Sequence, residues 1–468
     1  MNKYTLLLCI VLLAVFFSHS ANGEVKLPSI FGNNMVLQQQ TQAPIWGKTE
    51  SGKSVSVKTS WDGKSYSVKS DNHGNWKVII KTPKAGGPYT ITISDGSTIK
   101  LTGVLIGEVW ICSGQSNMEM SMKGYHNEPV IGGIEDIYAS TNESIRLFTV
   151  SKNTSISPLD DFTGKWEECI PGNVANFSAT AYYFGRMLQK SLGVPVGLIN
   201  TSWGGTRIEP WISEVGNKTF DFVKLPDKNQ AENITTQTPT VLYNAMIHPM
   251  EGYGIRGAIW YQGESNRNEY SNYEKLMPGL IQDWRNKWDI GDFPFYYVQI
   301  APFNYGSGIN SAFLREAQLK ASTVLPNIGM ISLMDTGEEF CIHPKNKRVC
   351  GERLAYYALA KTYGFEGVEY TGPVLKEYII DGSVVKLKFN HANNGLTTFG
   401  KELKNFRIAG ENKQFYPATA TITGDGITVV SPHVVKPVAV RYAFDDFVVG
   451  ELFNNEGFPA SSFRTDNW

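Results

Sequence analysis

The sequence has 468 residues, and its charge is nearly balanced, with 43 Lys and Arg against 44 Asp and Glu. The balance excludes the basic excess typical of nucleic-acid-binding proteins, and no run of like charges indicates a charged tail. Hydrophobic residues make up 42% and aromatic residues 12% of the chain, which indicates a globular protein with two or three domains. The 11 Trp and 22 Tyr favour β-rich structure and surfaces that contact sugars.

The first 23 residues have the pattern of a secretion signal. Lys3 supplies the positive charge, Leu6–Phe17 is an apolar run too short to span a bilayer, and Ser18–Gly23 offers small residues for cleavage. Cleavage is expected near Gly23, which leaves an exported chain, periplasmic or secreted. No other segment is long and apolar enough to predict a membrane span.

Four cysteines remain after cleavage: Cys112, Cys169, Cys341 and Cys350. Export permits disulfides, and Cys341 with Cys350 is the favoured pair because the two are close in sequence. The alternative is four buried thiols. The cysteines have no metal-ligand spacing and the seven histidines form no cluster, so neither a metal nor another cofactor is expected.

The pattern of the chain changes twice after the signal. Residues 24–103 show short alternating runs separated by Gly, Asp and Asn turns, which predicts a β-sandwich. Residues 104–362 alternate apolar strands with helices, and residues 363–468 return to short strands. The strands expected in the middle region are Val109–Cys112, Ile145–Val150, Val196–Asn200, Ala258–Tyr261, Phe295–Ile300 and Gly329–Leu333. The expected helices are Ala179–Ser191, Tyr270–Trp288, Ala312–Ser322 and Gly351–Tyr363.

Strand–helix alternation predicts an α/β domain with a parallel sheet and helices on both faces, where chemistry lies at the carboxyl ends of the strands. Ser116 follows the first expected strand in Gly114-Gln115-Ser116-Asn117. A serine at a strand-to-helix turn exposes its Oγ beside free backbone N–H groups, as a nucleophile requires. The alternative is a serine that only caps the helix.

Three further strand ends carry polar residues. Gly204 and Gly205 follow one strand, where their N–H groups are free to donate to an oxyanion. Gln262 and Glu264 follow another, where Gln262 could donate to an oxyanion and Glu264 could orient a histidine. Asp335 ends a third strand.

His343 follows in Ile342-His343-Pro344 and is the candidate general base, while His248 in Ile247-His248-Pro249 is a competing histidine. A serine, a histidine, an acid and backbone donors together predict acyl transfer to water through an acyl-enzyme.

Several blocks of the sequence resemble those of the sialate O-acetylesterase family, a branch of the SGNH hydrolases related to acetylxylan esterases. The blocks are Gly114–Met118, Trp203–Thr206, Trp260–Asn266 and Ile342–Pro344, with Phe31–Gln38 and Leu452–Ala460 near the two ends. The resemblance implies an SGNH-like three-layer α/β/α catalytic domain that removes O-acetyl groups from sugars. It makes Ser116 the nucleophile and His343 the base.

The resemblance also implies the roles of neighbouring residues. The oxyanion donors would be the N–H groups of Ser116 and Gly205 and the side chain of Gln262. The third member of the triad stays open: many SGNH enzymes have Asp three residues before the histidine, but Phe340 stands there, so Glu264 is favoured and Asp335 is second. The candidate substrate contacts are Gln115, Asn117, Trp203, Arg207, Trp260 and Tyr261, and Arg207 is either a carboxylate ligand or a structural ion pair.

Three functions remain open from the sequence. The first is a secreted carbohydrate esterase, with a serine nucleophile, that acts on O-acetylated sialic acids. The second keeps this chemistry but acts on xylan or another acetylated polysaccharide. The third is a non-catalytic glycan-binding protein on an esterase scaffold, which the presence of both Ser116 and His343 disfavours.

Overall fold

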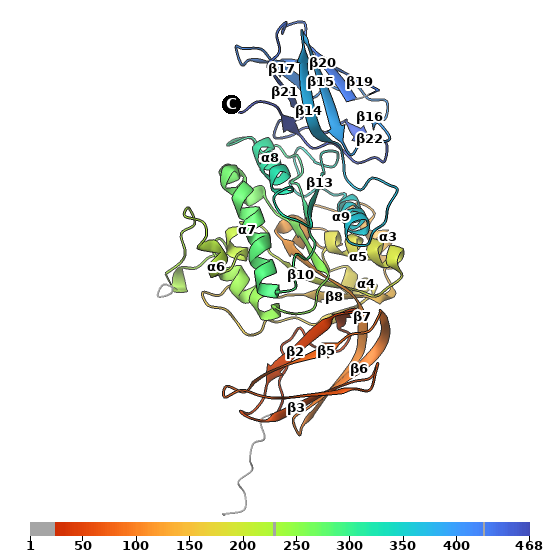
Figure 1. Ribbon diagram of the computed structural model, residues 1–468, viewed down its shortest axis with the longest axis vertical. Helices are drawn as coiled ribbons and strands as arrows, with labels where there is room; N and C mark the ends of the chain where they lie inside the picture. The colour runs from red at the N-terminus through yellow and green to blue at the C-terminus, as the bar shows by residue number, and fades with distance from the viewer. Residues whose placement is uncertain (1–23, 228–230, 425) are drawn as a thin grey trace, which may run out of the picture.

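The computed structural model describes residues 24–227, 231–424 and 426–468. The predicted signal, residues 1–23, lies outside the described residues. The chain forms an N-terminal β domain, a central α/β domain and a C-terminal β domain, stacked along the longest axis of the molecule (Figure 1). None of the helices in the described ranges has the length and apolar character needed to cross a membrane.

One long strand, β7 (Thr98–Gly114), belongs to two of these domains. Its first part pairs antiparallel with β6 (Gly86–Ser94) in the N-terminal domain. Its last part lies between β10 (Val196–Ser202) and β11 (Gly257–Tyr261) and is parallel to both. The boundary expected between residues 103 and 104 therefore falls inside a continuous strand.

The central sheet has the strand order β13-β12-β11-β7-β10-β8-β9. Its remaining strands are β8 (Asn142–Thr149), β9 (Trp166–Cys169), β12 (Phe295–Val298) and β13 (Ile328–Ile331). Every neighbouring pair is parallel except β8 with β9. The α/β class expected from strand–helix alternation is confirmed.

Helices cover both faces of this sheet. Because successive side chains of β7 point to opposite faces, they belong to two different apolar clusters. Val109 and Ile111 belong to an apolar cluster with Trp284 of α7 (Tyr270–Trp288). Trp110 and Cys112 belong to a second cluster with residues of α5 (Ala179–Leu192) and α9 (Lys347–Lys361). Burial of each large apolar side chain contributes about 1.5–3 kcal/mol, so the two clusters fix a three-layer arrangement. The helix α8 (Ala312–Ala321) lies against α7.

The helix that follows His343 begins earlier than expected. The sequence predicted a start at Gly351, but α9 begins at Lys347, where Asn346 Oδ1 accepts the N–H of Val349 at 3.3 Å. This side-chain cap satisfies one of the free donors of the first turn. The shorter helices are α2 (Ser116–Glu119), α3 (Gly133–Tyr138), α4 (Pro171–Val174), α6 (Glu214–Asn217), η1 (Glu209–Trp211), η2 (Ala231–Asn233), η3 (Tyr243–Ile247), η4 (His248–Met250) and η5 (Glu264–Glu269).

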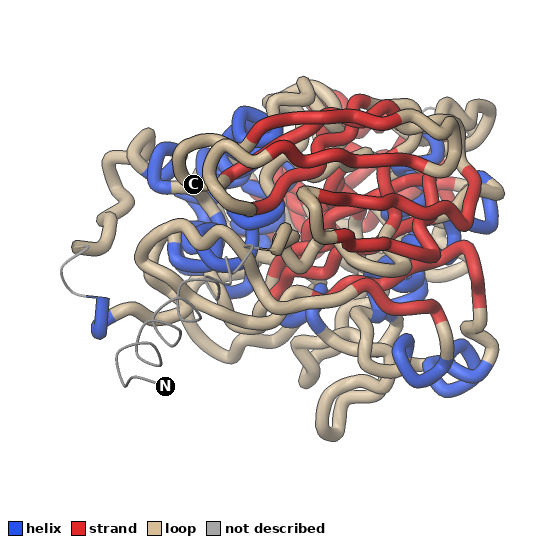
Figure 2. The backbone as a smooth tube through the Cα atoms, turned by 90° about the horizontal axis from the view of Figure 1, so that it is seen from below, coloured by secondary structure: helices blue, strands red, loops and turns tan. Residues whose placement is uncertain are grey.

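The N-terminal domain has strict inside–outside alternation in two of its strands, β3 and β5, where every second residue is buried. Its strands before β6 are β1 (Val36–Gln38), β2 (Gln42–Lys48), β3 (Ser54–Thr59), β4 (Ser65–Lys69) and β5 (Asn75–Lys81). The strands β2 and β5 pair with each other, and β3 pairs with β4 and β6. Figure 2 looks along the long axis from this end and shows strands running side by side across the near face.

The C-terminal domain contains two four-stranded sheets around its own apolar cluster. One sheet has the order β14-β15-β20-β19 and the other β18-β17-β21-β23. Their bounds are β14 (Val374–Asp381), β15 (Val384–Asn390), β17 (Phe406–Ala409), β18 (Phe415–Pro417), β19 (Thr419–Thr423), β20 (Gly426–Val430), β21 (Ala439–Tyr442) and β23 (Phe463–Arg464), with the separate pair β16 (Leu396–Thr397) and β22 (Phe453–Asn454).

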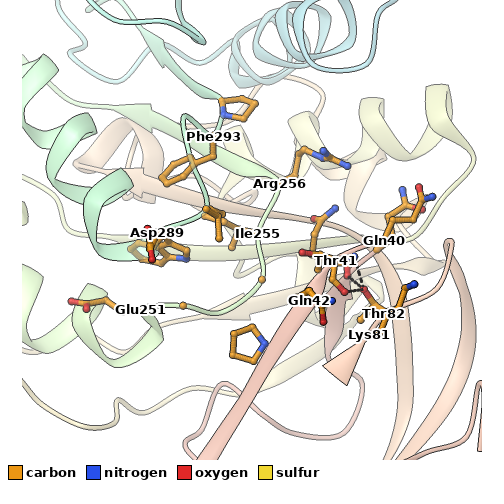
Figure 3. Close-up of a pocket in the computed structure, with 18 of the residues that line it drawn as sticks. Gln40, Thr41, Gln42, Lys81, Thr82, Glu251, Ile255, Arg256, Asp289 and Phe293 are labelled. Atoms are coloured by element: carbon orange, nitrogen blue, oxygen red, sulfur yellow. Dashed lines mark hydrogen bonds between the residues drawn. The ribbon is translucent and has the colours of Figure 1, made fainter. Parts of the chain in front are cut away.

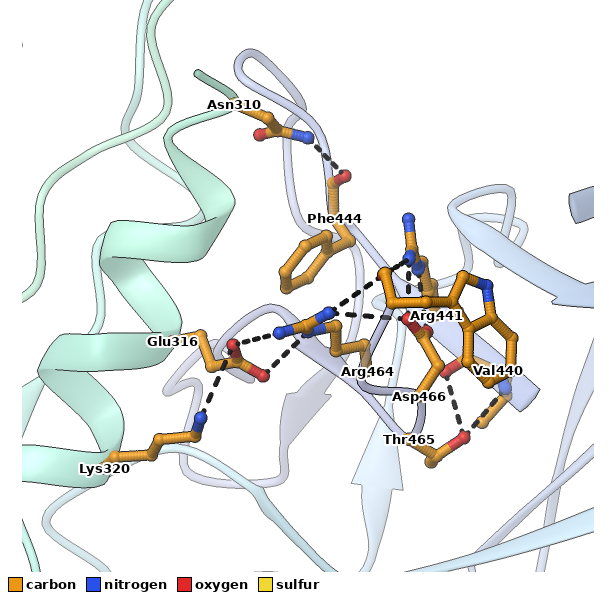
Figure 4. A network of polar contacts seen from close by, with 10 residues as sticks. Asn310, Glu316, Lys320, Val440, Arg441, Phe444, Arg464, Thr465 and Asp466 are labelled. Atoms are coloured by element: carbon orange, nitrogen blue, oxygen red, sulfur yellow. Dashed lines mark hydrogen bonds and ion pairs between the residues drawn. The ribbon is translucent and has the colours of Figure 1, made fainter. Parts of the chain in front are cut away.

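Charged groups attach this domain to α8 (Figure 4). Arg464 binds the Glu316 carboxylate through two N–H groups at 3.0 and 2.9 Å. Asn310 Nδ2 donates to the carbonyl of Phe444 at 3.0 Å. Such a bidentate pair fixes orientation as well as distance, so the C-terminal domain is held in one position on the central domain.

Candidate active site

The chain turns sharply between β7 and α2, and Ser116 is the first residue of that helix. Gly114 has a φ of 136°, and a Cβ there would lie 2.2 Å from the carbonyl oxygen of Tyr261. The N–H of Gln115 donates to the same carbonyl at 2.9 Å, which fixes the turn against β11. Gln115 and Asn117 are buried while Ser116 is partly exposed. The turn therefore presents the Ser116 side chain at the carboxyl end of the sheet.

Ser116 and His343 line the same open cavity, whose volume is about 440 Å³. The other residues that line it are Gln115, Glu119, Tyr125, Lys152, Trp203, Gly204, Gly205, Glu264, Ser265 and Ile342. The cavity thus gathers residues that lie more than 200 positions apart in the chain. No hydrogen bond joins Ser116 Oγ to His343 in the described chain, and catalytic hydrogen bonds of this kind often form only in the complex with substrate.

The carboxylate that holds His343 is Glu128. His343 Nδ1 lies 2.7 Å from Glu128 Oε2, and the imidazole ring packs edge-on against Tyr125 with the ring centres 5.1 Å apart. Tyr125 and Glu128 exchange backbone hydrogen bonds across a tight turn, so one turn supplies both contacts. Tyr125 Oη also donates to the carbonyl of Ser116 at 3.1 Å. With Nδ1 on Glu128, the ring leaves Nε2 as the nitrogen for proton transfer.

The expectation that Asp335 or Glu264 orients His343 does not match this geometry. Asp335 forms a bidentate ion pair with Arg353, at 2.7 Å for both contacts, because Arg353 is buried on α9 and needs a carboxylate partner. Glu264 Oε1 instead accepts from Asn117 Nδ2 at 2.7 Å. Neither carboxylate forms a hydrogen bond with the imidazole.

Asn117 connects the helix of Ser116 to the loop of His343. Its Nδ2 donates to Glu264 and to the carbonyl of Ile342 at 3.1 Å, while its Oδ1 accepts from Lys347 Nζ. Since the lysine can only donate, it fixes which way the amide of Asn117 points. Burial lowers the pKa of Lys347 to about 8 and raises the pKa of Glu264. Asn117 was expected to bind substrate, but it is 1% exposed and braces the floor of the site.

Two backbone donors stand free at the expected oxyanion position. Neither the N–H of Ser116 nor that of Gly205 donates to any described residue, and both residues line the cavity. Glu119 Oε2 accepts the N–H of Gly204, which anchors this loop to the helix of Ser116. Gln262 does not contribute as expected. It is fully buried, and its Nε2 donates to Asn266 Oδ1 at 2.8 Å and to the carbonyl of Thr206 at 3.2 Å.

The expected substrate contacts divide into two groups. Trp203 and Gln115 line the cavity, but Arg207, Trp260 and Tyr261 do not. Arg207 forms ion pairs with Glu209 at 2.8 Å and with Glu269 at 3.0 Å. Of the two roles expected for Arg207, the structure therefore has the structural ion pair and not the free carboxylate ligand. Trp260 and Tyr261 are fully buried in β11, where strand alternation directs one side chain into each apolar cluster.

Besides Tyr125, the cavity is lined by Lys152 and Glu119, which the sequence did not single out. The ammonium of Lys152 lies 5.5 Å from the ring centre of Trp203 and 2.6 Å from Glu119 Oε1. Lys152 follows the carboxyl end of β8, so strand-end position was the signal that could have found it. Glu128 lies in a turn with no such signal.

The cysteines do not form the expected disulfide, and the competing histidine, His248, does not line the cavity of Ser116. All four cysteines of the described chain are free thiols, so the favoured disulfide between Cys341 and Cys350 is absent. Cys350 is buried in α9, and Cys341 Sγ contacts the carbonyl of His343 at 3.2 Å. His248 pairs with Glu251 at 2.6 Å and lines a different cavity. Over the described ranges, no group of three or more His, Cys, Asp or Glu has the geometry of a metal site.

Comparison with known proteins gives concordant matches. The family model for carbohydrate esterases described as sialic acid-specific acetylesterases matches residues 106–360. The sialate O-acetylesterase of Mus musculus is 32% identical over 433 residues, covering 79% of each chain. The sialate O-acetylesterase of Homo sapiens is 32% identical over 411 residues, covering 77% of this chain and 76% of that protein.

A solved structure extends the match to three dimensions. The crystal structure of a carbohydrate acetylesterase from Xanthomonas citri superposes with a TM-score of 0.88 at 36% identity, and covers 95% of this chain and 100% of that chain. The match therefore includes all three domains and not only the central one.

Proposed function

This chain belongs to the sialic acid-specific acetylesterase family of carbohydrate esterases, and from that premise we propose that it removes O-acetyl groups from sialic acids, with Ser116 as the nucleophile. That the chain is an esterase follows from the family. The observation that carries the mechanism is the pairing of His343 with Glu128, because His343 lines the same cavity as Ser116.

In the first half-reaction, Ser116 Oγ attacks the carbonyl carbon of the acetyl ester while His343 Nε2 takes the hydroxyl proton. The carbonyl oxygen becomes an oxyanion, and the free N–H groups of Ser116 and Gly205 donate to it. Glu128 stabilises the imidazolium through Nδ1–H. Collapse of the tetrahedral intermediate breaks the ester C–O bond, and His343 returns the proton to the sugar oxygen as it leaves.

In the second half-reaction, water takes the place of the sugar. His343 Nε2 removes a proton from the water as its oxygen attacks the acetyl carbon bound to Ser116. A second oxyanion forms at the same N–H groups. Its collapse breaks the bond to Ser116 Oγ, which recovers its proton from His343, and acetate leaves.

Lys152 supports an acidic sugar as the substrate. Arg207 is engaged elsewhere, which leaves Lys152 as the cation at the open side of the cavity, beside the ring of Trp203. Its side chain is 44% exposed, and Glu119 uses one of its three N–H groups. A pyranose stacked on Trp203 would bring a carboxylate within reach of the remaining donors.

A second candidate keeps the chemistry and changes the sugar. The similar protein from Xanthomonas citri is described as a carbohydrate acetylesterase, a description that names no particular sugar. The cavity is open and lined by both polar and apolar groups, which also suits a neutral acetylated sugar such as a xylan unit.

Export of the chain is part of the proposal. The pattern of residues 1–23 supports cleavage near Gly23 and release to the periplasm or the medium. N-terminal sequencing of the protein recovered outside the cytoplasm tests it, and an N-terminus at Met1 would contradict it.

The deciding experiment measures acetate release from O-acetylated sialic acid, acetylated xylan and a simple acetyl ester in parallel. Ser116→Ala is the blank and should lose at least about 10⁴-fold in kcat, because the nucleophile and the base act as a unit. Release from the sialic ester that exceeds release from xylan supports the first candidate. The reverse order supports the second. No release from any substrate by folded protein would leave a glycan-binding scaffold.

A further inference from the structure

A groove follows the seam between the N-terminal and central domains. Its larger part is a cavity of about 1210 Å³, and its smaller part is a cavity of about 590 Å³. Lys77 and Glu251 line both parts, so the two cavities are adjacent, and together they are called the seam groove. Arg256 and Pro294 line it directly before β11 and β12 begin. The seam groove therefore lies at the amino ends of the parallel strands, whereas Ser116 lies at the carboxyl end.

The walls of the larger part come from both domains (Figure 3). Gln40, Gln42 and Thr41 face it from the N-terminal domain, and Ile255 and Phe293 face it from the central domain. Amide and hydroxyl groups can donate and accept at the same time, as hydroxyl-rich ligands require. The larger part therefore offers apolar side chains as well as polar ones, which suits the two kinds of surface that a sugar presents.

The charge in the larger part is predominantly positive. The cationic side chains that line it are Lys77, Lys81, Lys84, Arg256 and Lys287, against the carboxylates Glu251, Asp289 and Asp292. Lys77, Lys81 and Lys84 form no ion pair with any residue in the described part of the chain. Glu251 is already held by His248 and Tyr243, and Asp292 lies 3.6 Å from Arg285. The unpaired cations leave room for an anionic ligand.

These lysines stand in a row rather than in a point cluster. The exposed residues of β5 alternate along one face as Asn75, Lys77, Ile79 and Lys81, and Lys84 follows the strand. At about 3.3 Å per residue, Lys77 and Lys81 lie roughly 13 Å apart along the strand. An extended polymer with repeated negative charges matches this row better than a single small anion does.

The smaller part of the seam groove adds aromatic side chains. Trp46 is partly exposed there, and Trp76 lines the same cavity at 3% exposure. Trp76 Nε1–H is buried and donates to no described residue. Rigid aromatic rings beside polar donors are typical of surfaces that bind sugar rings.

We infer that the seam groove is a second, non-catalytic binding site for an acidic polysaccharide. The lysine row pairs with carboxylates along the polymer, and Trp46 contacts its sugar rings. Because the seam groove and Ser116 lie at opposite ends of the sheet, a bound polymer is retained near the esterase without occupying the cavity of Ser116. This site is independent of the chemistry assigned to Ser116.

The test measures binding of polysialic acid to the full chain carrying Ser116→Ala, so that no ester is consumed. The seam groove variant combines Lys77→Gln, Lys81→Gln and Lys84→Gln. The matched control combines Lys58→Gln, Lys69→Gln and Lys100→Gln, which are exposed lysines of the same domain that do not line the seam groove. Both variants lose the same charge, so only position differs. Neutral xylan of similar length is the second probe.

We expect the seam groove variant to bind polysialic acid about tenfold more weakly, because it loses three exposed ion pairs with the polymer. The control variant should change less than twofold, and added salt should weaken the unmodified chain more than the seam groove variant. Equal losses in both variants would reduce the effect to net charge and overturn the inference. The inference would also be overturned if polysialic acid did not bind detectably, or if xylan bound equally well and its binding did not change in the seam groove variant. In the Ser116 background, hydrolysis of a simple acetyl ester should be the same for the two lysine variants, which shows that both fold.

Discussion

Replacement of Glu128 by Gln tests which carboxylate holds His343. The contact of 2.7 Å between Glu128 Oε2 and His343 Nδ1 gains strength when the imidazole takes the proton of Ser116. A hydrogen bond to a charged group contributes about 1.5–3 kcal/mol, and about 1.4 kcal/mol corresponds to tenfold in rate. The side chain of Glu128 is 29% exposed, so solvent screens it and the loss stays below that of a fully buried triad acid. Glu128→Gln should therefore lower kcat about 10- to 150-fold.

The assay compares kcat and KM for a simple acetyl ester across a matched pair of variants. Glu264→Gln is the control, because a glutamine Oε1 still accepts the N–H of Asn117 and no contact to His343 is lost. Its kcat should fall by no more than about threefold. The thermal unfolding midpoint of each variant separates a catalytic loss from a folding defect. If Glu264→Gln lost more activity than Glu128→Gln, the pairing of His343 with Glu128 would not be the one that works in catalysis.

Three further outcomes follow from the structure. Lys152→Gln should raise KM for O-acetylated sialic acid about two- to fivefold and leave a neutral acetyl ester unchanged, as expected for one exposed ion pair; equal effects on both esters would refute a carboxylate contact. The pKa of Lys347 is about 8 in the folded chain and about 10.4 when unfolded, so between these pH values the unfolded chain binds more protons. As the pH rises through that interval, this group should increase the free energy of unfolding by up to about 3 kcal/mol. The free energy of unfolding of Lys347→Met, measured by urea denaturation at each pH, should lack this increase. The same pH dependence in the variant and the unmodified chain would contradict the burial of a charged lysine. Thiol titration of the denatured mature chain without reductant should find four reactive cysteines, and two would indicate a disulfide.

The sequence located the strand ends of the site because they depend on local pattern. The apolar run before Gly114 is a strand, the glycine permits the turn, and Ser116 follows as expected. Trp203 and Gly205 reach the same cavity for the same reason, since parallel strands end at one edge of the sheet.

The partner of His343 could not be found in this way. Glu128 lies in a turn held by its own backbone hydrogen bonds, far from His343 in sequence, and no periodic pattern connects them. Asp335 also had a strand-end position, but its carboxylate forms the bidentate ion pair with the buried guanidinium of Arg353. Which carboxylate meets which cation depends on packing between layers, and that packing is not encoded in a local motif.

The error with Trp260 and Tyr261 has a different origin. Both precede the polar residues after β11, and this proximity in sequence suggested a place in the site. In a central strand covered on both faces, however, every side chain points into one helix layer or the other. Only residues beyond the last ladder pair of the strand can reach the cavity, as Glu264 does.

The continuity of β7 relates the seam groove to the cavity of Ser116. The buried carboxylate of Glu108 binds Arg256 at 2.7 Å and Gln39 at 2.6 Å, and so ties the middle of this strand to both walls of the seam groove. The same strand then continues without a break to Gly114 and the turn that presents Ser116. A loss of the N-terminal domain would remove β6, the antiparallel partner of the first part of β7, and the hydrogen bond that Gln39 donates to the buried carboxylate of Glu108, although the ion pair with Arg256 would stay. The N-terminal domain is therefore part of the support of the catalytic turn and also one wall of the second binding site.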